Sequence, residues 1–238
     1  RVASAEHVAD NVIQLRLVKP EGFTWKTGEF ARVGLKIEGD EVFRAYSIGS
    51  APASETVDFY IANVTGGILS PKLNQIKTGD SVLIDTEVGG MLLADRLEAG
   101  GKDLWMFASG TGVSPFLAVL SDESITSRFE RLILVHGVRT WNETGYVSRL
   151  VKRSPKLTVV ACVTREKGAA VNERIPDALA DGSLEKLAGI TIEKEHSRVM
   201  LCGNPGMVKS VREAMKARGI VSPRGGKPGQ LLAENFWL

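Results

Sequence analysis

The hydrophobic pattern of this 238-residue chain changes near residue 100, and that change limits what the chain can fold into. Before it, short β-like runs are separated by Gly, Pro and Asp: "NVIQLRLVKP", "EFARVGLKI", "FRAYSIGS", "DFYIANV" and "GDSVLIDTEV". Short strands at this spacing are typical of an antiparallel barrel. Ser70 as an N-cap, followed by Pro71 in the first turn, predicts one short helix among these strands.

From about residue 102 the apolar runs become continuous: "LWMFA", "RLILVHG", "LTVVACV" and "RVMLCG". Helical segments are expected through "SPFLAVLSD", "GYVSRLVKR" and "PGMVKSVREAMKARG". Continuous apolar strands that alternate with amphipathic helices predict a parallel sheet covered on both faces. We therefore expect two domains, an antiparallel β-barrel over 1–97 and an α/β Rossmann-like domain over 98–238, with a hinge in "EAGGKD".

Composition excludes several classes of protein. The net charge of +2, with basic residues scattered among acids, does not indicate a nucleic-acid binder. No apolar run has the length needed to span a bilayer. Cys162 and Cys202 both follow apolar runs, which predicts reduced, buried thiols in a cytoplasmic protein rather than a disulfide or an iron–sulfur cluster. His7, His136 and His196 show no ligand spacing, so no metal site is expected.

The segment "VFRAYSIGS" carries the first candidate for chemistry. Arg44 and Tyr46 lie two residues apart and should share one face of a strand. A cation beside a flat ring suits a ligand with both a phosphate and an aromatic system, although an ordinary edge strand is the alternative. In "GGILSPKL", Ser70 and the following amides predict a second anion-binding point, with a plain capped helix as its alternative.

The segment "ASGTGVSPF" should turn from the first parallel strand into its helix. Gly110 and Gly112 would let the backbone turn tightly and approach a pyrophosphate. The segment is not a full G-x-G-x-x-G fingerprint, because Pro115 stands where the third glycine would be. An ordinary strand–helix turn is therefore the alternative.

Three arginines point to a particular nucleotide. Arg139 and Arg165 follow the carboxyl ends of consecutive strands, and Arg174 lies nine residues beyond Arg165. Ligands bind at that edge of an open α/β sheet, where Arg accommodates a 2′-phosphate and an NAD site would favour Asp or Glu. Each alone could be a solvated loop cation, but the set favours NADP(H).

Two further features lie near the C-terminus. Cys202, in "LCGNPGM", ends a strand where a nicotinamide would approach, although a buried Cys is often an inert small hydrophobe. Phe236 and Trp237, in "LLAENFWL", could cover a flat cofactor. The alternative is that these rings pin the last strand to the sheet.

Taken in order, "RAYS", "FYIANVTGGILSPKL", "LWMFASGTGVSPF", "VHGVR", "VTRE", "ERIP", "CGNPGMV" and the aromatic end resemble the bacterial type of the ferredoxin/flavodoxin–NADP reductase family across essentially the whole chain. The resemblance implies FAD in the barrel and NADP(H) in the second domain. The residues it assigns to FAD are Arg44, Ala45, Tyr46, Ser47, Tyr60, Ala62, Val64, Ile68, Leu69, Ser70, Thr111, Phe236 and Trp237. Those it assigns to NADP are Gly110, Thr111, Gly112, Arg139, Arg165, Arg174, Cys202, Gly203, Asn204 and Met207.

The resemblance also implies individual roles. Tyr46 would lie against one face of the isoalloxazine, Arg44 would contact the pyrophosphate, and Phe236 would cover the other flavin face. Trp237 would lie against the adenine. Ser47, Cys202 and Glu234 form the implied catalytic group, as positioning and hydrogen-bonding residues, with Glu234 assisting proton movement. The chain departs from the family in carrying Phe236 where many members have Tyr.

The function expected from this resemblance is an FAD-dependent exchange of hydride with NADP(H) and of single electrons with ferredoxin or flavodoxin. A cytoplasmic monomer is expected. An oxygenase reductase component or a free-flavin reductase of the same superfamily is the nearest alternative. A non-catalytic nucleotide-binding module is the alternative from another class, and it predicts a colourless protein.

Overall fold

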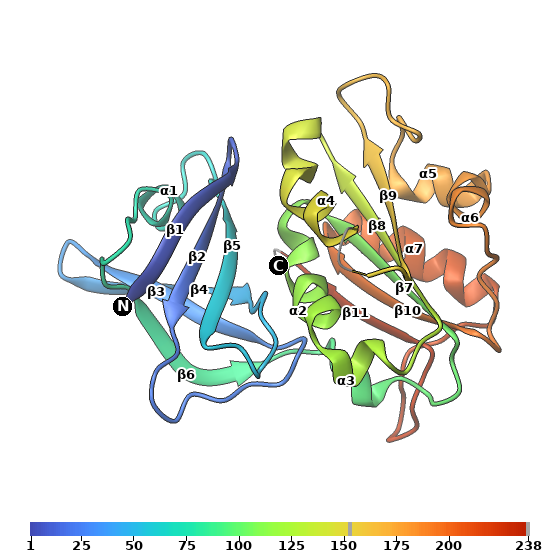
Figure 1. The fold of residues 1–238 in the computed structure, drawn as a ribbon, viewed down its shortest axis with the longest axis horizontal. Coiled ribbons are helices and arrows are strands. Elements are labelled where there is room, and N and C mark those ends of the chain that lie inside the picture. The colour runs from blue at the N-terminus through green and yellow to red at the C-terminus, as the bar shows by residue number, and fades with distance from the viewer. Residues whose placement is uncertain (152–153, 237–238) are drawn as a thin grey trace.

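The computed structural model describes residues 1–151 and 154–236, and the side chains of 149–151 are left out of the description. It consists of two domains that lie side by side (Figure 1). None of the helices among the described residues is long and apolar enough to cross a membrane.

The N-terminal domain is built from two three-stranded antiparallel sheets. Their orders are β1-β2-β5 and β4-β3-β6. Backbone hydrogen bonds link the two sheets at two places. The segment before β6 exchanges two with β1, from Val2 N–H to Asp80 O (2.8 Å) and from Gly79 N–H to Val2 O (2.9 Å), and the segment after β4 donates one to β5, from Gly49 N–H to Asp58 O (2.8 Å). The strands are β1 Val2–Ala9, β2 Val12–Val18, β3 Phe30–Ile37, β4 Asp40–Ser47, β5 Thr56–Ala62 and β6 Leu83–Gly89.

Strand β5 shows how this domain separates its core from its outer face. Val57, Phe59 and Ile61 are fully buried between the two sheets. Their neighbours Tyr60 and Ala62 are half-buried on the other face, because successive side chains of a strand point to opposite sides. Tyr60 packs against the core of the second domain, so this face of β5 forms part of the domain interface.

Helix α1 (Ser70–Leu73) begins one residue earlier than the sequence predicts. Leu69 occupies the N-cap position without a side-chain cap, and Pro71 lies in the first turn. Ser70 is inside the helix, and its hydroxyl accepts a hydrogen bond from the Val64 N–H (3.0 Å). The expected N-cap role of Ser70 is therefore wrong, because this hydroxyl fixes the preceding loop instead.

The C-terminal domain is a five-stranded parallel sheet in the order β11-β10-β7-β8-β9. Helices α2, α3 and α4 lie between the sheet and the N-terminal domain, and α5, α6 and α7 cover the far face (Figure 1). The strands are β7 Asp103–Ser109, β8 Arg131–Val138, β9 Leu157–Val163, β10 Ser197–Gly203 and β11 Leu231–Asn235. The α-helices are α2 Ser114–Ser121, α3 Glu123–Thr126, α4 Gly145–Val151, α5 Ile175–Ala180, α6 Ser183–Ala188 and α7 Pro205–Ala217, and the 3-10 helices are η1 Ala94–Arg96, η2 Gly110–Val113 and η3 Trp141–Thr144.

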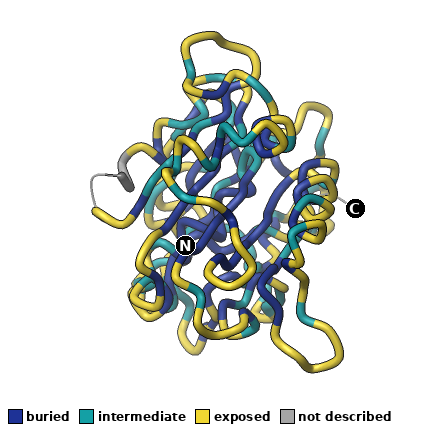
Figure 2. The backbone as a smooth tube through the Cα atoms, turned by 90° about the vertical axis from the view of Figure 1, so that its right-hand side faces the viewer, coloured by how far each residue is buried: buried dark blue, intermediate teal, exposed yellow. Residues whose placement is uncertain are grey.

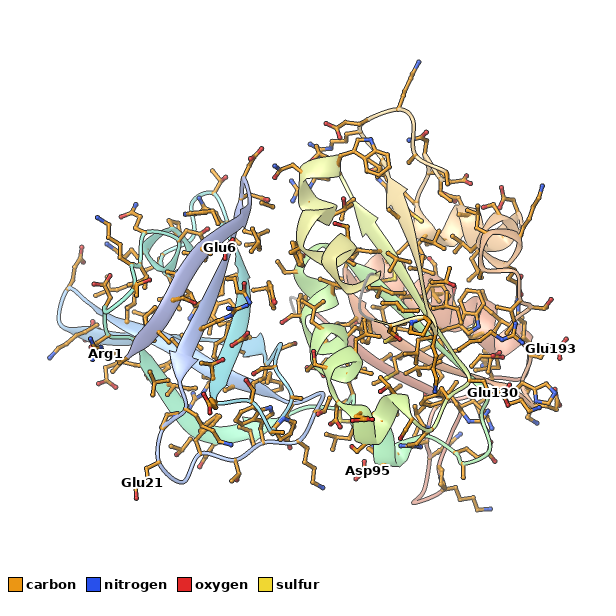
Figure 3. All side chains as sticks on the ribbon, in the orientation of Figure 1. Arg1, Glu6, Glu21, Asp95, Glu130 and Glu193 are labelled. Carbon is orange, nitrogen blue, oxygen red and sulfur yellow. The ribbon has the colours of Figure 1, made fainter. Side chains whose placement is uncertain are left out.

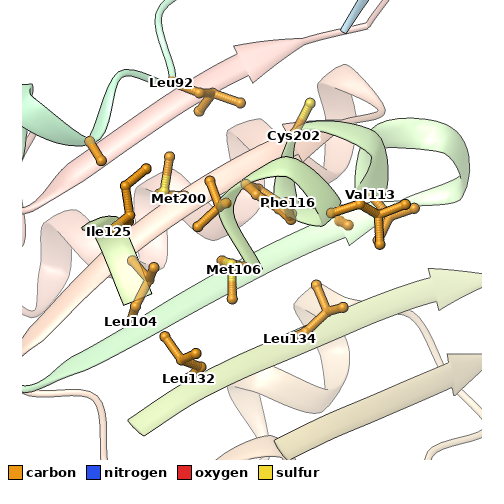
Figure 4. Packing of buried hydrophobic residues seen from close by; sticks show 14 of the residues in the cluster. Leu92, Leu104, Met106, Val113, Phe116, Ile125, Leu132, Leu134, Met200 and Cys202 are labelled. Carbon is orange, nitrogen blue, oxygen red and sulfur yellow. The ribbon is translucent and has the colours of Figure 1, made fainter. Parts of the chain in front are cut away.

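The parallel sheet has a separate apolar core on each face. The core nearer the N-terminal domain contains Phe116 of α2 and Met106 of β7, and also Leu92, which comes from the connection between the domains (Figure 4). The backbone is buried mainly along the strands and exposed in the loops (Figure 2). Charged side chains such as Glu21 and Glu193 are exposed at the outer edges of the molecule (Figure 3).

The predicted fold class is confirmed: an antiparallel β domain precedes a parallel α/β domain. The sequence pattern does not predict β1, α3, α5 or α6. Cys162 and Cys202 are both buried free thiols, as expected.

Candidate active site

A cleft of about 1030 Å³ opens at the carboxyl edge of the parallel sheet and reaches the N-terminal domain. Asn11, Val12 and Ala62 contribute one side of its wall, and Phe236 also lines it. The remaining wall comes from the ends of the parallel strands and from the loops and helices that follow them: Ser109, Gly110, Thr111, Gly137, Val138, Arg139, Glu143, Thr164, Arg165, Asn172, Glu173, Arg174, Ile175, Pro176, Asp177, Asn204, Gly206, Met207 and Ser210. This is the edge at which open α/β sheets bind ligands.

The turn after β7 is shaped by two glycines with different roles. Gly110 adopts a φ of +53°, and a Cβ there would meet open space. A Cβ on Gly112 would lie 2.5 Å from the Cys202 carbonyl oxygen, which is closer than real Cβ atoms come. Gly112 is therefore needed for the turn to pack against the end of β10, and Gly110 is the glycine that faces the cleft.

A hydrogen bond from a buried histidine fixes the turn after β7. The His136 Nε2 hydrogen-bonds the Gly110 carbonyl oxygen over 2.9 Å, so Nε2 carries the proton. Burial lowers the pKa of His136 to about 4, which keeps the ring neutral near pH 7. The His136 ring meets the edge of Tyr146, whose own ring stacks on Tyr60 of the N-terminal domain at a centroid distance of 5.3 Å.

The three predicted arginines all line the cleft. The Arg165 N–H donates to the Arg139 carbonyl oxygen (2.9 Å), which joins the loops after β8 and β9. Within the described residues, Arg165 and Arg174 make no ion pair, whereas the Arg139 Nε lies 3.9 Å from a Glu143 carboxylate oxygen. The structure thus brings together the group that the sequence predicts for a 2′-phosphate.

The end of β10 presents the start of α7 to the same cleft. The Ser109 hydroxyl accepts a hydrogen bond from the Asn204 N–H (2.8 Å). The Asn204 Oδ1 in turn caps α7 by accepting the Gly206 N–H (2.9 Å). Asn204 and Met207 line the cleft. Gly203, with a φ of +134°, lets the backbone pass close to Ser109.

Cys202 and Glu234 lie side by side on paired positions of β10 and β11. The Cys202 side chain lies in the apolar core rather than in the cleft wall (Figure 4), and burial with the nearby Glu234 charge raises its pKa well above the usual range. Burial also raises the pKa of Glu234, opposed by the hydrogen bond that its Oε2 accepts from the Met91 N–H (3.2 Å). This hydrogen bond ties β11 to the connection between the domains.

The predicted FAD residues of β4 and of the loop before α1 lie outside the cleft, on the N-terminal domain. Arg44 is exposed, and within the described residues it makes no ion pair: its Nη1 donates to the Phe43 carbonyl oxygen (2.7 Å). Burial raises the pKa of the neighbouring Tyr46 to about 12, although the Arg44 charge opposes this rise. Val64 and Ile68 are exposed apolar side chains, the latter by 61%.

Comparisons with known proteins found family profiles for both domains and relatives that match the full chain. A family profile described as "Oxidoreductase FAD-binding domain" matches residues 1–91, and one described as "Oxidoreductase NAD-binding domain" matches residues 106–213. The Ferredoxin–NADP reductase of Pseudomonas aeruginosa is 33% identical over 251 residues, which cover 100% of this chain and 96% of that protein. The Flavodoxin/ferredoxin–NADP reductase of Escherichia coli is 34% identical, with 100% and 97% covered.

The chain belongs to the ferredoxin–NADP reductase family. A solved family structure, the ferredoxin NADP+ reductase from Neisseria gonorrhoeae with bound FAD and NADP, superposes with a TM-score of 0.92 at 31% identity and covers 98% of this chain and 96% of that one. The resemblance inferred from the sequence is thereby confirmed.

Two further residues that the sequence assigns to the site, Ser47 and Phe236, join neighbouring elements through hydrogen bonds of their backbone groups. Ser47 is buried, and its carbonyl oxygen accepts a hydrogen bond from the Ser114 hydroxyl (3.0 Å), which fixes the end of β4 to the start of α2. The Phe236 N–H donates to the Gly203 carbonyl oxygen (2.8 Å), and its half-buried ring lines the cleft. Trp237 lies outside the described residues.

Several cleft residues of this ferredoxin–NADP reductase family member were not predicted from the sequence. Asn11 and Val12 reach the cleft from the β1–β2 turn, and Glu143 reaches it from η3. Thr164 directly precedes Arg165, so the strand-end rule that found the arginine could also have found it. No comparable local signal marks Asn11 or Glu143.

Proposed function

We propose that this protein is an FAD-dependent oxidoreductase that exchanges hydride with NADP(H) and single electrons with ferredoxin or flavodoxin. One observation carries the proposal: Arg139, Arg165 and Arg174 line a single cleft that is shared with the N-terminal domain. The family assignment, with FAD and NADP bound in the Neisseria gonorrhoeae structure, supports both cofactors.

The N-terminal domain has residues that fit FAD. No hydrogen bond of the described residues uses the N–H groups of Ile68 and Leu69, so these donors are available to a pyrophosphate. Arg44, which among the described residues makes no ion pair, can supply a cation to it. Exposed Val64 and Ile68 offer apolar surface that a flat ring system would cover, and Tyr46 offers a half-buried ring. Bound there, FAD would convert between one-electron and two-electron chemistry.

The second domain has residues that fit NADP(H). The arginines supply fork-shaped donors for a 2′-phosphate, and the open backbone at Gly110 allows a pyrophosphate to approach closely. Phe236 lines the cleft, and a nicotinamide that approached the flavin would have to displace its ring. The raised pKa of Glu234 favours a carboxyl that can hold a proton near this region.

The remaining assignments are also proposals. Ser47 and Cys202 position the elements around the flavin and nicotinamide, and Ala45, Tyr60, Ala62, Ser70 and Thr111 complete the FAD contacts. We propose residues 1–97 and 98–238 as the two functional units. Leu92, Ala94 and Leu97 of the first unit pack in the core of the second domain. A cytoplasmic monomer that docks one small carrier at a time completes the proposal.

Steady-state kinetics tests the proposed reaction. The purified holoprotein should oxidise NADPH rapidly with flavodoxin or ferredoxin as acceptor, and slowly with free FMN or FAD. Faster turnover with free flavin than with either carrier would instead assign the protein to the free-flavin reductases. A colourless protein without NADPH oxidation would reject both enzyme functions and leave a nucleotide-binding module.

A further inference from the structure

The cleft that we assign to NADP(H) contains a carboxylate directly beside one of its arginines. Glu143 lines the cleft together with Arg139, and its side chain is only 15% exposed. One carboxylate oxygen lies 3.9 Å from the Arg139 Nε, and the other accepts a hydrogen bond from the Arg139 backbone N–H (3.2 Å). Glu143 is thus fixed beside one of the three cations expected to bind a 2′-phosphate.

The effect of Glu143 on a bound anion depends on the other charged groups of the cleft. Besides the three arginines, the wall contains three carboxylates, Glu143, Glu173 and Asp177, so the formal charges of these groups cancel. Burial, and then the nearby Asp181 and Asp177 charges, raise the pKa of Glu173. Glu143 differs from both in being fixed directly on an arginine by two contacts.

We propose that Glu143 limits the preference of this protein for NADP(H) over NAD(H), by occupying Arg139 in the place where a 2′-phosphate would bind. This inference rests on the proposed function, which assigns the cleft to NADP(H). A 2′-phosphate must compete with Glu143 for the guanidinium and is repelled by its charge. A 2′-hydroxyl carries no charge and can donate to a carboxylate, the usual arrangement in NAD sites.

Glu143 acts through Arg139 and is therefore a positioning residue for the nucleotide. Its partly buried position reduces screening by salt, so the charge acts at short range on a bound anion. Replacement by Gln keeps an oxygen that can accept the Arg139 N–H and removes the charge. The structural role of the side chain and its electrostatic role can therefore be separated by choice of variant.

The test measures binding of adenosine 2′,5′-bisphosphate and of AMP to the FAD-loaded protein by titration calorimetry. Glu143→Gln and Glu143→Ala should lower the Kd for the bisphosphate by about threefold to tenfold, and that for AMP by less than about twofold. KM for NADPH should fall with kcat unchanged. Glu143→Asp should lower the Kd for the bisphosphate less than the other two variants do, because it retains the charge. Glu213→Gln, at an exposed position of α7, is the matched control and should change neither Kd.

A double-mutant cycle shows whether the effect passes through Arg139. The gain from Glu143→Gln should be smaller in an Arg139→Gln background, where only the direct repulsion between carboxylate and phosphate is left to relieve. Unchanged or weaker bisphosphate binding in both Glu143→Gln and Glu143→Ala would overturn the inference while leaving the proposed function in place. A wild-type protein that binds the bisphosphate no better than AMP would overturn the proposed function, and the inference with it.

Discussion

At the scale of single residues, the three arginines of the cleft differ in whether an acidic side chain forms an ion pair with them. Arg165 and Arg174 are exposed and make no ion pair within the described residues, whereas Arg139 has Glu143 as a partner. Arg165→Gln and Arg174→Gln should each raise KM for NADPH by about tenfold, because a charge-assisted hydrogen bond to phosphate is lost. KM for NADH should stay nearly the same.

Lys167→Gln is the matched control for this prediction. Lys167 is an exposed cation two residues from Arg165, but it does not line the cleft. Steady-state kinetics with both nucleotides should therefore find the Lys167 variant close to wild type. Equal losses with NADPH and NADH in the arginine variants would contradict the assignment to a 2′-phosphate.

His136 gives a residue-scale prediction about pH. Burial lowers its pKa in the folded protein from 6.5 to about 4, so at pH values between these two the unfolded chain binds more protons than the folded one. The stability from neutral His136 is complete above pH 6.5 and is lost as the pH falls towards 4. The loss amounts to about 3 kcal/mol in the free energy of unfolding.

Urea unfolding at several pH values between 4 and 7 measures this effect. His136→Gln can still donate to the Gly110 carbonyl but does not titrate, so its stability should change less with pH than that of the wild type. His7→Gln, at an exposed position, should keep the wild-type pH dependence. Parallel pH curves for wild type and His136→Gln would show that His136 is not the titrating group.

At the scale of elements, the turn between β7 and α2 depends on where its glycines lie. A Cβ at Gly112 would lie 2.5 Å from a backbone oxygen of β10, whereas one at Gly110 meets nothing within 4 Å. Gly112→Ala should therefore lower the free energy of unfolding by about 3 kcal/mol, through overpacking against rigid backbone. Gly110→Ala should lower it by only about 1 kcal/mol, from its positive φ. Chemical denaturation of both variants checks the ranking, and a reversed order would contradict this packing.

Elements with strong local patterns were predictable from the sequence, and those that depend on distant contacts were not. Buried parallel strands such as β7 and β10 read as continuous apolar runs. Strand β1 did not, because its residues alternate irregularly between buried and exposed. Helices α5 and α6 have six residues each, too few for a clear helical period.

The residues of the candidate site likewise divide into those that a local sequence pattern predicts and those that depend on distant contacts. Arg139, Arg165 and Gly110 follow strand ends, a position that sequence alone marks as ligand-binding. The opposing role of Glu143 and the reach of Asn11 into the cleft depend on how η3 and the β1–β2 turn meet the other elements. Ser70 shows the limit of local rules, since its hydroxyl bonds to Val64 rather than capping its helix.

At the scale of the whole molecule, the two domains meet through a ring stack as well as through hydrogen bonds. Tyr60 of β5 stacks on Tyr146 of α4, and the Asn142 side chain accepts the Asp10 N–H (2.7 Å). Tyr146→Leu should lower the free energy of unfolding by about 2 kcal/mol, because the buried ring is lost from the interface. In the double variant with Tyr60→Leu, the loss in the free energy of unfolding should be smaller than the sum of the losses in the two single variants. Strict additivity in denaturation experiments would contradict an energetic link through this stack.

The arrangement of the two domains places the two proposed cofactor sites around one interface. Arg44 and Tyr46 lie on β4, whose end is tied by Ser47 to α2 of the second domain. Phe236 lines the cleft from the end of the described chain. Electrons would therefore pass from a nicotinamide in the cleft to a flavin on the N-terminal domain across this interface.

Anaerobic mixing of the purified holoprotein with NADPH tests this central claim most directly. The visible absorption band of the bound flavin should bleach with a stoichiometric amount of NADPH, and more slowly when NADPH carries deuterium at the transferring carbon. A protein without a flavin band, or a flavin band that NADPH leaves unchanged, would contradict the account.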